Sequence, residues 1–165
     1  MDTTTFTFER LETALDSFIR DFIGTYKSIL LRDGKKATGN LVASLKPVSI
    51  QLKNNRYEVG ISIASYWKYV EYGRKPGKWP PRDKILEWIK VKPVIPRPNN
   101  GAKLPTQEQL AFLISRKIGR DGIEPGNQFE EALRLVWSRW EDRISNAISS
   151  DLDEQLELVT LGLTK

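Results

Sequence analysis

The chain has 165 residues, of which 39% are hydrophobic and 28% are charged, and its formal net charge is +5 at pH 7. A chain of this length is expected to form one domain with a real core. It has no cysteine, which excludes disulfides, thiol nucleophiles and thiolate metal sites. It has no histidine, so the commonest general base and metal ligand are missing. We expect no membrane span and no signal peptide, because the chain shows neither apolar pattern.

Positive charge is concentrated in the middle of the sequence. Residues 32–103 contain 16 Lys and Arg against 5 Asp and Glu, whereas the remainder contains 10 against 16. One interpretation is a solvated basic face on a small domain. The other is a surface that faces DNA or an acidic protein partner.

The first predicted element is a long amphipathic helix over residues 8–31, in which apolar residues recur every three or four positions. Asp33 and Gly34 are expected to end this helix, with the glycine as a left-handed cap. Residues 36–45 are typical of a second, short helix, which Pro47 is expected to end.

A β-hairpin is predicted next. Residues 48–52 and 57–63 alternate apolar and polar side chains, and Asn54 and Asn55 between them tolerate a positive φ. Because two strands alone are marginal, we expect the flanking helices to cover the apolar face of this hairpin.

The segment 64–81 combines aromatics, cations, glycines and prolines. Residues 75–78 fit a type II turn, and Pro81 suits the first turn of a helix over 82–90. That helix is expected to bury Ile85, Trp88 and Ile89. Trp79 is the exception among the tryptophans, which we otherwise expect in the core. It lies between cations and prolines, where it can anchor a protein interface or stack on a nucleic acid base.

Two more helices follow a proline-rich extended segment (93–98) and an exposed bend (99–101), which together form the expected mobile region. Thr106 with Gln109 forms a capping-box pattern. The helix that this pattern opens runs to about Gly119 and is expected to bury Leu110, Leu113, Ile114 and Ile118.

The last predicted helix is long. Asn127 with Glu130 repeats the capping pattern, and the helix runs to about Val159. Its apolar stripe comprises Leu133, Trp137, Trp140, Ile144, Ile148, Leu152, Leu156 and Val159. Such a helix outruns the core of a small domain, so its distal half must pack elsewhere. It can fold back on the N-terminal helix or pack against neighbouring subunits.

Three segments of the chain carry a family resemblance, and they follow one another in the family's order. The first, at 37–45, is ATGNL with Ser44-Leu45. The second, at 66–89, holds YWKYVEYG, RKPGKWPP and ILEWI, and the third, at 110–129, is LAFLISRKIGRDGIEPGNQF. Together they resemble phage neck and tail-completion proteins over residues 37–129. The helix after Phe129 departs from the usual pattern, which leaves the position in the stack of rings open.

The resemblance implies a structural virion protein, one subunit of a six- or twelve-fold homo-oligomeric ring around the DNA channel at the head–tail junction. It further implies assembly in the host cytoplasm and contact with portal, connector or tail-tube proteins. Non-specific contact with genomic DNA would suit the basic middle region. The alternative function is a non-specific DNA-binding module.

No catalytic residue, metal site or cofactor is expected. The acidic residues Asp16, Asp21, Asp151, Asp153 and Glu154 are interpreted as solvated surface groups. Glu58 and Lys68 come nearest to a nuclease pair, but Glu58 alternates away from the apolar face of the hairpin. A phosphate-loop likeness at 119–122 follows a helix rather than a strand, which is the wrong context. Glu71 is either an exposed helical residue or a bridge to Arg74, Arg82 or another subunit.

The predicted fold is α+β: a small antiparallel sheet containing the hairpin at about 48–63, covered by helices, with long N- and C-terminal helices. The predicted organisation is a single domain over 1–165, with a family-like core at 37–129 and a long helix at 130–165. Candidate interface residues are Tyr72, Arg74, Lys75, Lys78, Trp79, Ile144, Ile148, Leu152 and Leu156. Candidate DNA-channel residues are Lys35, Lys36, Lys53 and Arg56.

Overall fold

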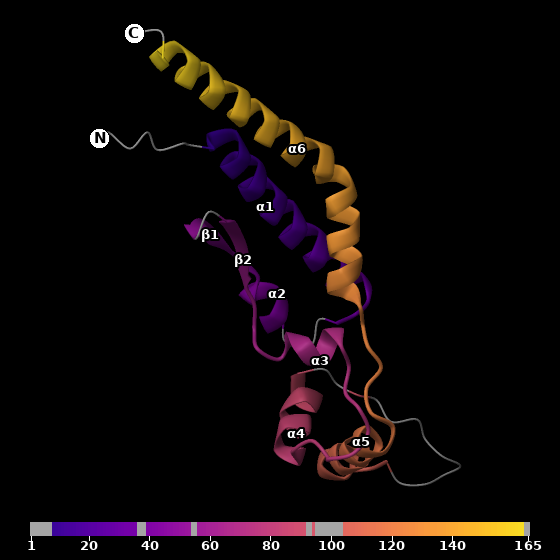
Figure 1. Ribbon diagram of the computed structural model, residues 1–165. Helices are drawn as coiled ribbons and strands as arrows, with labels where there is room; N and C mark the ends of the chain where they lie inside the picture. Colours follow the sequence, from indigo (N-terminus) through magenta and orange to yellow (C-terminus); the bar gives the residue numbers. More distant parts are fainter. Residues whose placement is uncertain (1–7, 36–38, 54–55, 92–93, 95–103, 164–165) are drawn as a thin grey trace. The chain divides into compact units, whose positions relative to one another are not determined.

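A computed structural model describes residues 8–35, 39–53, 56–91, 94 and 104–163 of the chain. The fold is α+β, as predicted, with long helices at both ends of the described chain and one β-hairpin (Figure 1). Within the described residues the elements are α1 (Glu9–Arg32), α2 (Asn40–Ser44), β1 (Lys46–Lys53), β2 (Arg56–Ser62), α3 (Trp67–Glu71), α4 (Arg82–Val91), α5 (Gln107–Asp121) and α6 (Gln128–Leu163). None of these helices is long and apolar enough to span a bilayer.

The chain forms two compact units, each built from separate stretches of sequence. Unit 1 comprises Met1–Ile29, Leu45–Ser62 and Phe129–Lys165, and therefore holds most of α1, the hairpin and nearly all of α6. Unit 2 comprises Leu30–Ser44 and Ile63–Gln128, and holds α2 to α5.

The hairpin of unit 1 is antiparallel, with Lys46 opposite Ser62 and Lys53 opposite Arg56. A bulge falls between Val48 and Gln51, where the pairing register shifts. Pro47 does not simply end the preceding helix, because it lies inside β1. The predicted turn at 54–55 lies outside the described residues.

The cover of the hairpin is partial. On β2 the apolar side chains of Tyr57, Val59 and Ile61 are half-buried, and Phe8 contacts the Tyr57 ring edge-on at 6.2 Å. On β1, Val48 and Leu52 are 42% and 56% exposed. The predicted alternation therefore buries one strand better than the other.

The α1 helix behaves as its periodicity predicts. The buried positions include Leu11, Ile19, Phe22, Ile23, Tyr26 and Ile29. At its end Gly34 has φ +64, the Gly34 N–H donates to Leu31 O at 3.1 Å, and the Lys35 N–H donates to Leu30 O at 2.9 Å. These two bonds form a Schellman motif, which confirms the predicted stop.

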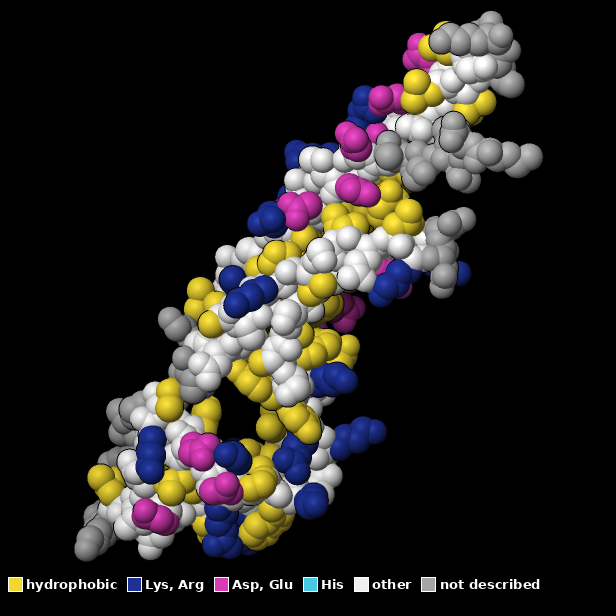
Figure 2. Space-filling view, turned by 90° about the vertical axis from the view of Figure 1, so that its left-hand side faces the viewer, with side chains coloured by type: hydrophobic (Ala, Val, Ile, Leu, Met, Phe, Trp, Pro, Cys, Tyr) yellow, Lys and Arg dark blue, Asp and Glu magenta, His cyan; other side chains and the backbone are white. Residues whose placement is uncertain are grey.

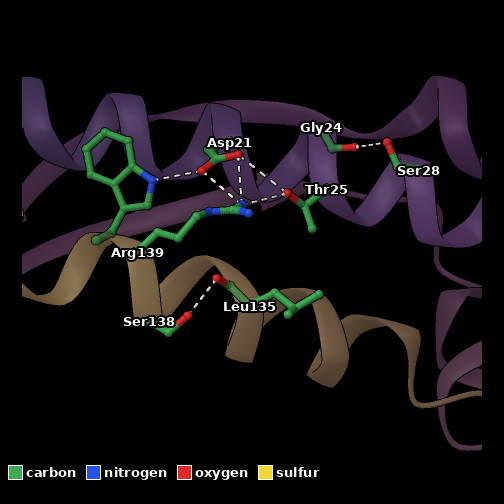
Figure 3. Close-up of polar contacts among 8 residues, drawn as sticks. Asp21, Gly24, Thr25, Ser28, Leu135, Ser138 and Arg139 are labelled. Carbon is green, nitrogen blue, oxygen red and sulfur yellow. Dashed lines mark hydrogen bonds and ion pairs between the residues drawn. The ribbon is translucent and has the colours of Figure 1, made fainter.

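In unit 1, α6 packs beside α1. Phe129 meets the rings of Phe22 and Tyr26 at 4.9 and 5.5 Å, and Ala132 and Val136 are fully buried. Next along the pair, the Asp21 carboxylate accepts hydrogen bonds from the Arg139 guanidinium at 3.1 Å and from the Trp140 indole at 2.9 Å. Figure 3 shows Asp21 and Thr25 on α1 facing Arg139 on α6. Asp21 is therefore not simply a solvated surface group: its side chain is 37% exposed, but its carboxylate also bonds to α6.

Asp151 is also not a surface group. Its side chain is 3% exposed, and its carboxylate accepts from the backbone N–H of Leu11 at 2.8 Å and of Arg10 at 3.3 Å. The Arg10 guanidinium pairs with both Asp151 and Glu154. A carboxylate on α6 thus caps the N-terminus of α1, where unpaired backbone donors and the helix dipole favour negative charge.

The predicted apolar stripe of α6 is only partly used within the chain. Trp140 and Ile144 are half-buried, whereas Leu133, Trp137, Ile148, Leu152, Leu156 and Val159 are 36% to 64% exposed. The helix also continues past Asp151 to Leu163, about 18 Å at 1.5 Å per residue. The N-terminal helix therefore covers α6 along one line, and a neighbouring apolar line stays exposed.

At the start of α6 the predicted capping geometry differs from the structure. Asn127 has φ +56, in the left-handed region, whereas an N-cap residue normally has an extended backbone. Its N–H donates to Glu71 O at 3.2 Å instead.

Unit 2 packs α4 against α5, and the fully buried positions of α5 are small residues, whereas the predicted Leu110, Ile114 and Ile118 are half-buried. Ala111, Ser115 and Gly119 are buried at intervals of four, and the Ser115 hydroxyl donates to Pro80 O at 2.7 Å. The predicted burial of Leu113 is wrong, because Leu113 is 49% exposed. The capping box of Thr106 and Gln109 is confirmed by both of its hydrogen bonds.

In α4, Ile89 is buried and Ile85 is half-buried, as predicted. Trp88 is 36% exposed, so its predicted burial is wrong.

Candidate functional site

The basic turn, Arg74 to Trp79, is fastened to the body of unit 2 by backbone bonds. Arg74 and Ile123 exchange two N–H to carbonyl bonds of 2.8 Å, and the Gly77 N–H donates to Gly119 O at 2.7 Å. The Arg74 guanidinium donates to Lys78 O, which joins the two ends of the turn. Gly77 has the positive φ that the sequence predicts, but its value of +136° lies well above that of an ideal type II turn.

Trp79 is half-exposed rather than free. Its ring lies on Gly119, where an added Cβ would sit 2.1 Å from Trp79 Cδ1, and it meets Phe112 edge-on at 5.8 Å. The exposed fraction of Trp79 is 46%. Trp79 therefore helps to seat the turn on α5, and only its outer part is available to a partner.

The residues just before the basic turn are also closely packed. Gly73 has φ +66, and a Cβ there would lie 2.1 Å from Ile123 O, so the position accepts only glycine. Two residues before Gly73, Glu71 is 2% exposed, and its backbone carbonyl accepts from the Gly126 N–H at 2.9 Å. The interpretation of Glu71 as an exposed helical residue is wrong.

A row of tyrosines leads into the basic turn. Tyr66, Tyr69 and Tyr72 follow one another at intervals of three along α3 and its caps, and they are 42%, 60% and 67% exposed. The spacing places them along one side of the helix. Of the three, only Tyr72 was predicted as an interface residue; the repeated interval of three is the signal in the sequence that marks Tyr66 and Tyr69 as well.

The predicted interface residues fall into two groups. Tyr72, Arg74, Lys75, Lys78 and Trp79 lie together in unit 2, where both lysines are exposed. The rest lie on α6 in unit 1, namely Ile144, which is half-buried, and the exposed Ile148, Leu152 and Leu156.

The candidate DNA-channel residues are also divided. Lys53 and Arg56 are opposite each other in the hairpin of unit 1, and Lys53 pairs with Glu58 at 3.5 Å. Lys35 is exposed in unit 2, and Lys36 lies outside the described residues.

The two compact units differ in net charge. Unit 2 contains 16 Lys and Arg against 7 Asp and Glu, whereas unit 1 contains 10 against 14. In Figure 2, Lys and Arg side chains gather over the lower part of the view, where α4 and α5 lie. The distal half of α6, residues 144–163, holds four acidic residues and no basic one.

Two ion pairs lower the pKa of carboxyl groups in unit 2. A hydrogen bond from Arg32, together with one from Gln128, lowers the pKa of Asp33. A hydrogen bond from Arg120 lowers the pKa of Asp121. In both cases the donors favour the charged form.

An open groove lies beside α5. It has a volume of about 680 Å³ and is lined by Arg82, Pro105, Glu108, Gln109, Phe112 and Leu113. The Arg82 guanidinium lies 4.6 Å from the centre of the Phe112 ring. This lining pairs no nucleophile with a base. Among the described residues, no acidic cluster could hold a metal ion. The prediction of a non-enzymatic protein stays a prediction.

No protein-family model matches the chain, and neither a curated protein nor a solved structure matches it.

Proposed function

We propose that this chain is a structural virion protein, one subunit of a homo-oligomeric ring at the head–tail junction of a tailed phage. Six- or twelve-fold rings with portal, connector or tail-tube neighbours are the form that the sequence resemblance implies. The proposal rests on that resemblance together with how the resembling segments pack.

The observation that carries the proposal is how the resembling segments pack. The 66–89 segment contacts the 110–129 segment through the exchange between Arg74 and Ile123 and through the Glu71 carbonyl, which accepts from the Gly126 N–H at 2.9 Å. The Ser44 hydroxyl of the 37–45 segment accepts from the Ala64 N–H at 2.9 Å, two residues before the 66–89 segment begins. If the three segments form the core of one family fold, they should pack together in the structure. Segments that match a family pattern by chance have no reason to lie close together.

The exposed surfaces support a role in assembly. The tyrosine row and the outer part of Trp79 are residue types enriched at protein interfaces, and they stand on a firmly bonded scaffold. On α6 a second group of large apolar side chains is exposed.

The test is localisation in the virion. Gold-labelled antibody against the chain should mark the head–tail junction of purified particles. Interrupting the gene should give filled heads that do not join tails, and supplying the intact chain should restore joining. Unlabelled particles, or infectious particles made without the chain, would contradict the proposal.

A non-specific DNA-binding module is the second candidate, favoured by the excess of positive charge in unit 2. Its signature is duplex affinity that falls steeply with salt concentration and is reduced by charge reversal of Lys75 and Lys78. Affinity that is absent at low salt would exclude this candidate.

A further inference from the structure

The distal part of α6 presents an exposed apolar stripe beside negative charge. Leu152, Leu156 and Val159 are 45%, 64% and 40% exposed, and their intervals of four and three place them along one side of the helix. We call these three residues the distal stripe. Asp153 and Glu157, also exposed, each follow a leucine of the stripe in the sequence, so they lie about 100° around the helix from Leu152 and Leu156.

Unit 2 presents the complementary surface. The tyrosine row (Tyr66, Tyr69 and Tyr72) offers aromatic area with polar tips, and the exposed Lys75 and Lys78 follow it directly in the basic turn. Leucine against tyrosine buries apolar area without burying the hydroxyl groups. Lysines beside the row can meet carboxylates beside the stripe.

Charge decides which surfaces can meet. Two distal α6 segments brought together would place the exposed carboxylates of Asp153 and Glu157 against those of the other copy, and two basic turns would place cations against cations. An acidic apolar stripe against a basic aromatic row has opposite charges that attract and orient the contact. The chain therefore carries two unlike, mutually complementary surfaces.

We propose that the distal stripe of one copy docks on the tyrosine row of a second copy, with Asp153 and Glu157 facing Lys75 and Lys78. The inference rests on the proposed function, because it names the surfaces through which the subunits join. A contact between unlike patches repeats from copy to copy, and it closes into a ring when the rotation permits.

The test uses two charge-reversal variants of the full chain. One carries Asp153→Lys with Glu157→Lys, and the other carries Lys75→Glu with Lys78→Glu. All four positions are exposed, so thermal unfolding should stay close to that of the wild type. Arg116→Glu with Lys117→Glu, at exposed positions of α5, makes the same charge change in unit 2 and is the matched control.

Sedimentation velocity at low salt should show association of the wild type and of the control. Each reversal variant alone should lose affinity by about tenfold or more, because like charges meet at every contact. An equimolar mixture of the two should associate again, since alternating copies restore an opposite-charge pair at each contact.

Several results would overturn the inference. Failure of the mixture to associate would mean that these surfaces do not meet. Unchanged association of the Lys75 and Lys78 variant, with loss of DNA binding alone, would assign the lysines to DNA. A wild type that stays monomeric would exclude the contact, whereas labelling of virions would still decide the proposed function independently.

Discussion

At the scale of the residue, the close packing of Trp79 on Gly119 fixes the shape of the basic turn. The glycine leaves room for the indole ring, and no other side chain fits beneath it. The side chains of Lys75 and Lys78 are exposed, whereas the Lys78 carbonyl accepts the Arg74 guanidinium within the turn. The shape of the turn therefore depends on its backbone, Arg74 and Trp79 rather than on the lysine side chains.

Gly119→Ala should destabilise the protein by about 1–3 kcal/mol, because the new methyl group overlaps the Trp79 ring and forces it out of its seat. Gly24→Ala, in a helix position with open space around it, is the matched control and should stabilise by up to about 1 kcal/mol. Urea unfolding followed by tryptophan fluorescence measures both. Equal behaviour of the two variants would contradict the packing.

A pH dependence is expected at Asp33. Because its pKa is lowered in the folded state, its contribution to stability is present above the ordinary carboxyl pKa of about 4. The contribution is lost as the pH falls through the lowered value. Asp33→Asn should therefore be less stable than the wild type near neutral pH, and the difference should shrink in acid.

Unfolding midpoints in urea at neutral and acidic pH test this expectation, with the exposed Asp142→Asn as control. A difference between Asp33→Asn and the wild type that stays constant with pH would show that the carboxylate is not stabilised by its partners.

At the scale of the element, patterns of large apolar residues predicted where helices lie better than which side is buried. The limits of α1, its glycine stop and the capping box of α5 follow from local chemistry, and the structure confirms them. The fully buried positions of α5 do not follow from hydrophobic size, although the predicted Leu110, Ile114 and Ile118 are half-buried. The fully buried positions hold small residues, because the chain before α4 approaches so closely that Ser115 bonds to Pro80 O.

The same limit applies to the polar positions of α1 and α6. Asp21 and Asp151 look like surface carboxylates in the sequence, yet each receives donors from the other helix. Which helix lies opposite is a property of the tertiary fold, so periodicity along one helix cannot reveal it. For the candidate site, Tyr72 and the basic turn were predicted, whereas Tyr66 and Tyr69 were missed.

Which face of α5 is buried can be tested by enlarging a buried side chain and truncating an exposed one. Ala111→Leu should cost about 1–3 kcal/mol by overpacking a position that is 2% exposed. Leu113→Ala should cost less than about 1 kcal/mol, because Leu113 is 49% exposed. Thermal unfolding measures both, and the reverse order of effects would restore the face that the sequence predicted.

At the scale of the whole molecule, the two compact units differ in charge. Unit 2 is basic and carries exposed aromatic side chains, whereas the distal half of α6 in unit 1 is acidic and carries exposed aliphatic ones. Clusters of exposed large apolar side chains are typical of interaction surfaces. We therefore propose that the chain is a subunit that is completed by further copies.

The most direct measurement of that claim is the mass of the purified full chain, determined by sedimentation over a range of concentrations up to tens of micromolar. We predict species heavier than the 18.9 kDa single chain, at integer multiples, that dissociate as salt is raised. A single-chain mass at every concentration and salt level would contradict it.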